Sequence, residues 1–489
     1  MDTENCPVTI PYSFASANGV FFDGSDLLVH RPGLRLSTLL EIRSQTNAPF
    51  KLKEISEEEF NREITHHYQG NGENEARQVA EDIGTDSDLI HLADQIPDSG
   101  ELMDGNNDAP VIRLINAILS QAVRNKASDI HIEPYEDRLS IRFRVDGVLS
   151  EVLSPKLVLA PLLASRIKVL AKLDIAEKRL PQDGRFSVRL AGHPVDFRIS
   201  TIPSAHGERV VLRLLDKQAG RMTLDQLSMP DTMLDRFKNL LHKPHGIILI
   251  TGPTGSGKTT SLYAGLSHLN ETSRNILTIE DPIEYLIPGI GQTQVNPKID
   301  MTFARGLRAI LRQDPDIVMI GEIRDAETAS IAVQASLTGH LVLSTLHTNT
   351  AIGAITRLRD MGIEPFLLSS SILAVMAQRL VRLLCQHCKE PFKPDSDLRH
   401  RLNLPEEATL FRPSGCPHCN HSGYQGRSSI FELIDIDDTL AQAINKDQDE
   451  AQLLSYARQK SRSISDAARD KIINGETSLE EVMRVTAVG

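Results

Sequence analysis

The sequence has no tryptophan, only 4% aromatic residues and no long apolar run. No stretch approaches the roughly 20 apolar residues that cross a bilayer, and the N-terminus lacks the basic start and apolar segment of a signal peptide. A formal charge of −12 argues against a protein that mainly grips nucleic acid. A content of 40% apolar residues still suffices for globular domains, and 489 residues predict two to four of them. We expect a cytosolic chain that reaches a membrane through partners.

The most specific pattern is a phosphate-binding loop, Gly-Pro-Thr-Gly-Ser-Gly-Lys-Thr, at residues 252–259. An apolar run before it predicts a buried strand and the residues after it predict a helix, which is the context that this loop requires. Glycines let successive backbone N–H groups point at phosphate oxygens. Lys258 is expected to reach the β- and γ-phosphates, and the Thr259 hydroxyl to bind Mg²⁺. The predicted nucleotide-binding residues are Gly252, Pro253, Thr254, Gly255, Ser256, Gly257, Lys258, Thr259 and Thr260.

Acidic residues follow two further buried strands of the same region. Glu322 follows the apolar run 317–320, and Glu280 and Glu284 follow the run 275–279. Ligands of doubly wound sheets bind at the carboxyl ends of the strands, and hydrolysis needs a carboxylate near Mg²⁺ and a positioned water. We therefore expect these three glutamates to be catalytic, without deciding which one positions the water.

Histidines and arginines supply weaker candidates. His340 precedes and His347 follows the strand predicted at 341–345, so His347 is expected nearer the γ-phosphate. Arg305, Arg308 and Arg312 have helical spacing and form one basic face. That face is either solvated, an oligomer contact or a phosphate sensor.

Four of the five cysteines form two Cys-x-x-Cys hooks separated by 27 residues. In a reducing compartment this pattern predicts a structural Zn²⁺ site with four thiolates, Cys385, Cys388, Cys416 and Cys419. A redox pair is the alternative, and a neighbouring histidine (His387, His418 or His421) could replace one thiolate. Cys6 is expected to be an incidental thiol.

The order of patterns predicts an α/β protein: a P-loop motor domain with a zinc-binding insert, preceded by two small α+β domains. The first is expected over 1–95, with an acidic linker to about 109, and the second over 110–220. Alternating strands and helices predict the motor domain over 221–384. The tetracysteine subdomain is expected over 385–425, and a helical region over 426–489.

These motifs, in this order, resemble the ATPase superfamily of type II secretion and type IV pilus machines. The matching segments are the phosphate loop, an acidic box at 279–284, the strand and acidic residues at 317–325 and a histidine box at 337–347. Further likeness lies at 127–133, 180–185 and 206–209. Length, the tetracysteine insert and residues 108–116 most resemble the protein E family of type II secretion.

The resemblance implies a RecA-like motor, a homohexameric ring and ATP hydrolysis with ATP, Mg²⁺ and Zn²⁺ bound. It implies that Arg198 and Arg213, on strands of the second domain, fold over the γ-phosphate as an arginine finger would. The implied partners are the cytoplasmic domain of the inner-membrane secretion protein L and the inner-membrane platform protein F. The chain is then peripheral on the cytoplasmic face of the inner membrane and powers pseudopilus assembly and protein export through the outer membrane.

Two alternatives stay open at this stage. An ATPase of type IV pilus assembly shares the motor motifs, although a longer N-terminal region would favour it. A ring ATPase that translocates nucleic acid is the other class, which the acidic charge opposes.

Overall fold

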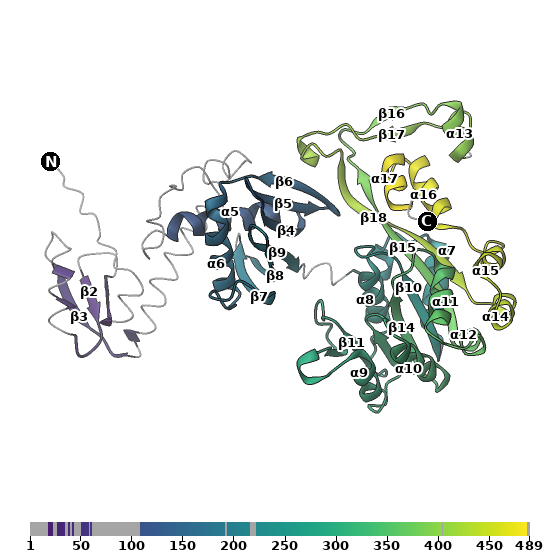
Figure 1. Ribbon diagram of the computed structural model, residues 1–489, viewed down its shortest axis with the longest axis horizontal. Coiled ribbons are helices and arrows are strands. Elements are labelled where there is room, and N and C mark those ends of the chain that lie inside the picture. The colour runs from purple at the N-terminus through teal and green to yellow at the C-terminus, as the bar shows by residue number, and fades with distance from the viewer. Residues whose placement is uncertain are drawn as a thin grey trace. The chain divides into compact units, whose positions relative to one another are not determined.

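The computed structural model describes residues 18–22, 27–34, 38–39, 42–43, 50–57, 59–60, 108–190, 193–215, 222–402 and 404–486. Cys6 and the predicted acidic linker as far as residue 107 lie outside these ranges. The chain divides into two compact units, Met1–Val145 with Leu149–Leu214 and Asp146–Val148 with Leu215–Gly489 (Figure 1).

The first part of the chain contains a small three-stranded sheet. In it, β1 (Val20–Phe22) pairs antiparallel with β2 (Leu27–His30), which pairs parallel with β3 (Lys51–Glu54). Phe21 packs against Phe60 with ring centroids 5.6 Å apart. Val20, Phe21 and Phe22 of β1 and Leu28 and Val29 of β2 are buried in this core.

Residues 108–215 form a six-stranded sheet with two helices over one face. The strand order is β6-β5-β4-β9-β8-β7. The elements are α5 (Asp108–Arg124), β4 (Ala127–Pro134), β5 (Leu139–Val145), β6 (Val148–Leu153), η2 (Leu157–Leu159), α6 (Ala160–Leu170), β7 (Gln182–Leu190), β8 (His193–Ser204) and β9 (Gly207–Leu215). An apolar stripe on α5, formed by Leu114, Ile115, Ile118, Leu119 and Ala122, is buried in the core of this domain. The α+β prediction for this segment is confirmed.

A seven-stranded sheet forms the centre of the second unit, in the order β12-β11-β13-β14-β10-β15-β18. Its strands are β10 (Gly246–Thr251), β11 (Ile276–Glu280), β12 (Gly291–Gln294), β13 (Ile317–Ile320), β14 (Leu341–Leu346), β15 (Ile372–Leu384) and β18 (Tyr424–Asp435). Every pairing is parallel except that between β15 and β18. The central strands are buried along their whole length, because helices cover both faces of the sheet.

Two apolar clusters lie on the two faces of this sheet. One cluster includes residues of α7 (Asp231–Leu241) and α8 (Lys258–Leu269). The other includes residues of α9 (Phe303–Ile310), α10 (Ala326–Leu337), α11 (Ala351–Asp360), α12 (Pro365–Ser371), α14 (Asp438–Asn445) and α15 (Glu450–Ala457). This is the doubly covered α/β sheet that the alternating pattern predicts.

The region after β15 differs from the prediction of a tetracysteine subdomain followed only by helices. Between β15 and β18 lie a hairpin of β16 (Glu390–Phe392) and β17 (Leu410–Arg412), helix α13 (Ser396–Leu402) and the turn η6 (Pro417–Cys419). Strand β18 then returns to the sheet of the motor domain, so residues 424–435 are not helical. Only α14 to α17 follow the expectation of a helical tail.

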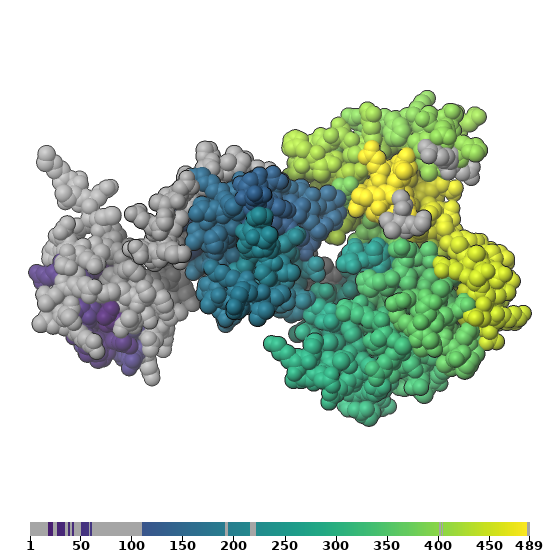
Figure 2. All heavy atoms as spheres, viewed as in Figure 1, coloured from purple at the N-terminus to yellow at the C-terminus, as the bar shows by residue number. Residues whose placement is uncertain are grey.

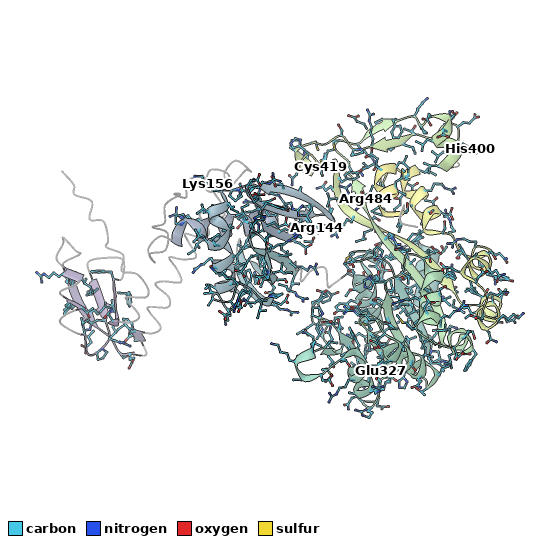
Figure 3. All side chains as sticks on the ribbon, viewed as in Figure 1. Arg144, Lys156, Glu327, His400, Cys419 and Arg484 are labelled. Atoms are coloured by element: carbon cyan, nitrogen blue, oxygen red, sulfur yellow. The ribbon has the colours of Figure 1, made fainter. Side chains whose placement is uncertain are left out.

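The helical tail packs against the same unit, and Figure 2 shows its yellow atoms against the green atoms of the preceding residues. Helices α16 (Ile464–Ile473) and α17 (Leu479–Thr486) lie over β15 and β18. The carboxylate of Glu481 accepts hydrogen bonds from Arg382 of β15 at 2.8 Å and from Arg484, which Figure 3 labels, at 2.6 Å. Burial opposes ionisation, but the two guanidinium groups outweigh it and lower the pKa of Glu481 to about 2.

Candidate nucleotide site and tetracysteine centre

The phosphate loop joins β10 to α8 at the carboxyl edge of the sheet. Its glycines have left-handed or unusual backbone angles, with φ of 153° at Gly252, 79° at Gly255 and 88° at Gly257. A Cβ atom on Gly252 would lie 2.5 Å from the carbonyl oxygen of Gln378, and one on Gly257 would lie 2.9 Å from the amide of the same residue. Glycine is therefore required at both positions, by angle and by space.

Lys258, the first residue of α8, points its ammonium group back into the loop. Nζ donates to the carbonyl oxygens of Gly252 at 2.7 Å and of Pro253 at 3.1 Å. Burial lowers the pKa of Lys258 to about 8, the Glu322 carboxylate opposes that shift, and the Arg379 guanidinium adds to it. Negative phosphate oxygens would stabilise this charge. Pro253, Thr254, Gly255 and Thr259 are exposed, Gly257 and Thr260 are partly exposed, and Ser256 is buried.

Glu322 and His347 meet at the ends of two adjacent strands. Glu322 follows β13 and His347 follows β14, and His347 Nε2 lies 3.4 Å from Glu322 Oε2. Arg324 binds the other oxygen of Glu322. Burial lowers the pKa of His347, and the Lys258 charge acts in the same direction. These four side chains form one cluster beside the phosphate loop, whereas His340, bonded to Ala335, lies at the opposite end of β14.

The two glutamates of the acidic box have different surroundings. Glu280 is 3% exposed, and its carboxylate accepts hydrogen bonds from three side chains: Tyr263 on α8, Thr278 at 2.5 Å and Gln292 on β12 at 3.1 Å. Burial raises the pKa of Tyr263, and the Glu280 charge raises it further. Glu284 is exposed. The Glu280 carboxylate thus binds α8, β11 and β12 together, which a sequence pattern does not reveal.

The three arginines of the predicted basic face have partners within the unit. Arg305 pairs with Asp300 at 2.9 Å, and Arg308 pairs with Glu327 of α10 at 2.6 Å (Figure 3 labels Glu327). Arg312 lies beyond the end of α9 and donates to the carbonyl oxygen of Arg308 at 2.9 Å. These contacts fit the solvated-face interpretation.

Arg198 and Arg213 lie on neighbouring strands of the six-stranded sheet. Arg198 of β8 is opposite Arg185 of β7 and is partly exposed. Arg213 of β9 donates to Asp129 of β4 at 2.9 Å, and its side chain is 55% exposed. Asp129 belongs to the segment 127–133 that the sequence analysis singles out, and it holds the guanidinium of Arg213 in place.

The four cysteines of the two hooks converge. Their Sγ atoms all lie within 4.8 Å of one another, and three Sγ–Sγ distances are 3.8 Å. A tetrahedral Zn²⁺ with Zn–S bonds of about 2.3 Å requires sulfurs about 3.8 Å apart, whereas a disulfide requires about 2 Å. The sulfurs therefore fit Zn²⁺.

Backbone donors support thiolates at this centre, where Cys419 is labelled in Figure 3. Gly415 N donates to Cys388 Sγ at 3.3 Å, and Gly423 N donates to Cys419 Sγ at 3.2 Å. The two thiols differ in the result. Burial raises the pKa of Cys388 to about 11 against the Gly415 N–H, whereas at Cys419 the backbone N–H groups of Cys416 and Gly423 outweigh burial and lower the pKa to about 6. Among the described residues, the group that could hold an ion contains these cysteines and no histidine.

Comparison with known protein families shows the family to which the chain belongs. The model described as "Type II/IV secretion system protein" matches residues 104–484, and a second model, for an N-terminal domain of "GSPII protein E", matches residues 9–68. The chain belongs to the type II secretion system protein E family. It is 57% identical to the type II secretion system ATPase E of Vibrio cholerae, over 98% of this chain and 96% of that protein. It is also 57% identical, with the same coverage, to a type II secretion system protein E of Pseudomonas aeruginosa.

Solved structures of related motors share the fold. The pilus retraction motor PilT with bound ADP is 26% identical, with a TM-score of 0.52, covering 75% of this chain and 95% of that one. The ATPase DotB of Legionella pneumophila is 24% identical, with a TM-score of 0.56, covering 77% of this chain and 95% of that one. The prediction of a RecA-like secretion ATPase is confirmed. No helix in the described part of the chain is long and apolar enough to span a membrane.

Several residues around the nucleotide site could not be predicted from the sequence. Gln378 and Arg379 of β15 lie against the phosphate loop, and Thr251 bonds to Thr348 at 2.5 Å. Thr251 and Thr348 are 97 residues apart in the sequence, and Gln378 and Arg379 belong to none of the motifs above. In the sequence, Thr251, Gln378 and Arg379 are distinguished only as polar residues inside otherwise apolar strands.

Proposed function

We propose that this secretion ATPase hydrolyses ATP at the loop 252–260 to power assembly of a pseudopilus and the export of proteins through the outer membrane. The observation that supports this proposal best is the cluster at the carboxyl edge of the sheet. There the phosphate loop, Lys258 and the Glu322–His347 pair lie at the ends of adjacent strands. A phosphate site next to a carboxylate–histidine pair is what hydrolysis of a phosphoanhydride needs.

The roles of individual groups follow from their positions. Lys258 meets the β- and γ-phosphates, and the exposed Thr259 hydroxyl is a ligand for Mg²⁺, which neutralises phosphate charge when bound. Glu322 orients the attacking water, and His347 contacts the γ-phosphate side of the site. Glu280, whose two oxygens are engaged, acts by fixing α8 against the sheet. The exposed Glu284 contributes negative charge at the edge of the nucleotide site.

Arg198 and Arg213 are proposed to act on the γ-phosphate of the bound nucleotide during hydrolysis. Both lie partly exposed on the polar face of their sheet, and the resemblance to the family assigns them to the γ-phosphate. Arg213 would leave or share its ion pair with Asp129 when it binds the phosphate. Such an arginine stabilises charge that develops in the transition state.

The tetracysteine centre is proposed to bind one structural Zn²⁺ per chain. The spacing of the four sulfurs supports this, and four thiolates leave no open position for catalysis. The ion would hold the two hooks together at the junction between β15 and β18.

We further propose that six copies form a ring in the cytoplasm at the inner membrane. The domain at 1–95 would dock on the cytoplasmic domain of secretion protein L, and the motor would act on platform protein F. Fractionation of cells with and without protein L tests this. We expect full-length chain in the membrane fraction only with protein L, and chain lacking residues 1–95 in the soluble fraction in both strains. Pelleting of the truncated chain would refute the docking role.

The alternatives have less support. The relatives above are named for type II secretion rather than for pilus assembly. A nucleic-acid translocase would need a basic track, and the charge of −12 opposes one. ATP turnover stimulated by DNA, and not by acidic lipid with the cytoplasmic domain of protein L, would favour the translocase.

Turnover by the purified oligomer tests the site itself. Lys258→Ala should abolish hydrolysis with the fold intact, because the charge that meets the β- and γ-phosphates is lost. Lys298→Ala, a change at an exposed lysine of the same unit, is the matched control and should keep wild-type turnover. Wild-type turnover of the Lys258 variant would refute the proposed site.

A further inference from the structure

Arg379 occupies an unusual position for a charged residue. It lies on β15, which pairs with β10 on the side opposite β14, and Thr251 at the end of β10 is level with Ala377. Arg379 is thus beside the first residue of the phosphate loop, yet it is only 6% exposed. A buried guanidinium costs several kcal/mol in lost hydration unless its surroundings compensate it.

The guanidinium connects its own strand, β15, to the loop that leaves β14. Nη1 donates to the carbonyl oxygen of Gln378 at 3.1 Å and lies 3.2 Å from where a Cβ of Gly252 would be. Nη2 donates to the carbonyl oxygen of Asn349 at 2.6 Å. Asn349 is two residues after His347, in the loop that leaves β14. Arg379 therefore spans the end of β10 and fixes the loop of His347 beside the phosphate loop.

A second tie supports the same connection. The Thr348 N–H donates to Thr251 Oγ1 at 3.1 Å, and the two threonine hydroxyls are 2.5 Å apart. The loop that contains His347 is thus held to the end of β10 by Thr251 and to β15 by Arg379. Its geometry relative to the phosphates depends on these two contacts.

The electrostatics agree with a position next to phosphate. Both hydrogen bonds of Arg379 go to backbone carbonyl oxygens, so its positive charge is not cancelled by them. Burial lowers the pKa of Arg379, and Glu432 opposes that shift. The same guanidinium lowers the pKa of Lys258, which shows that the two charges interact. Phosphate groups on the loop would stabilise both cations.

We propose that Arg379 is a positioning residue for ATP hydrolysis: it holds the His347 loop in register with the phosphate loop. The inference rests on the proposed role of His347. Lysine keeps the charge but cannot bridge two carbonyl groups with a planar fork. Arg379→Lys should therefore leave nucleotide bound but misplace His347.

A double-mutant cycle in the full-length protein tests this. We expect Arg379→Lys to lower kcat by about 10- to 100-fold, with ADP affinity changed by less than about threefold. In a His347→Ala background the same change should lower kcat by less than about threefold, because a residue that acts through His347 has nothing left to position. Equal factors in both backgrounds, or wild-type kcat of the single variant, would overturn the proposal.

Two further variants keep the result interpretable. Arg382→Lys makes the same change on the same strand where the guanidinium binds Glu481, and should leave kcat within about twofold. If Arg379→Lys melts at a clearly lower temperature, Thr251→Val removes the other tie of the loop and should give the same pattern, lower kcat with ADP affinity retained. If Lys258→Ala still hydrolysed ATP, the proposed function would be refuted. If Lys258→Ala were inactive while Arg379→Lys kept full activity, only this inference would be refuted.

Discussion

Replacing Glu280 should destabilise the motor domain, although the sequence pattern marks it as a catalytic acid. Glu280→Ala would leave three buried or partly buried donors, from Tyr263, Thr278 and Gln292, without their acceptor. An unsatisfied buried donor costs about 1–3 kcal/mol, and hydrogen bonds to charged groups lie at the upper end. Because the three contacts share one carboxylate, their losses do not add fully, and we expect about 3–5 kcal/mol in total.

Urea unfolding followed by tyrosine fluorescence can measure this loss, because the chain has no tryptophan to mask it. Tyr263 and Tyr285 are in edge contact with centroids 4.5 Å apart, so their emission reports on this region. A loss of about 4 kcal/mol moves the midpoint of the transition by about 2 M urea at a slope of about 2 kcal/mol per M.

Two comparisons separate a structural from a catalytic role. Glu280→Gln keeps one acceptor oxygen and should lose less stability than the alanine variant. Glu284→Ala, at the exposed position of the same box, should change stability by less than about 0.5 kcal/mol. An unfolding midpoint of Glu280→Ala equal to that of the wild type would refute the reasoning and leave a purely catalytic role for Glu280.

Three further predictions concern other parts of the chain. Metal analysis of freshly purified protein should give one zinc per chain, and Cys416→Ser should lose it while retaining ADP binding; absence of zinc with all four thiols reactive would refute the centre. The Glu481 pKa of about 2 lies below its ordinary 4.5, so its contribution to stability is present above pH 4.5 and lost as pH falls toward 2; Glu481→Gln should flatten acid unfolding in that window, and an unchanged profile would contradict it. Arg213→Ala should lower turnover by about 10³-fold with little change in ADP affinity, and full activity would exclude it from the chemistry.

The sequence predicts the parts of this protein that local patterns determine. The phosphate loop depends on glycines within eight residues, and the buried strand before it depends on an unbroken apolar run. The cysteine hooks likewise have a spacing that predicts Zn²⁺ coordination, and their sulfurs converge as that spacing requires. In each case the interactions that determine the structure lie within one short segment or between two similar segments.

Contacts between distant segments are what the sequence does not predict. Strand β18 pairs antiparallel with β15 after an insert of about 40 residues, and nothing in its own apolar pattern distinguishes it from the start of a separate domain. The buried state of Glu280 depends on Gln292 from an edge strand, and the contact of Arg379 depends on a backbone carbonyl group at Asn349. A motif therefore predicts where in the fold a carboxylate lies, whereas the hydrogen bonds of that carboxylate determine whether its role is structural or catalytic.

The central claim is that Glu322 activates water for ATP hydrolysis beside the phosphate loop. Glu322→Gln is nearly isosteric and removes the charge, and Glu327→Gln on the neighbouring helix is the matched control. The decisive measurement is turnover and nucleotide affinity of both variants in the same oligomer. The account predicts that Glu322→Gln binds nucleotide like the wild type and loses turnover by at least about 100-fold, while Glu327→Gln retains it. Wild-type turnover of Glu322→Gln would contradict the account.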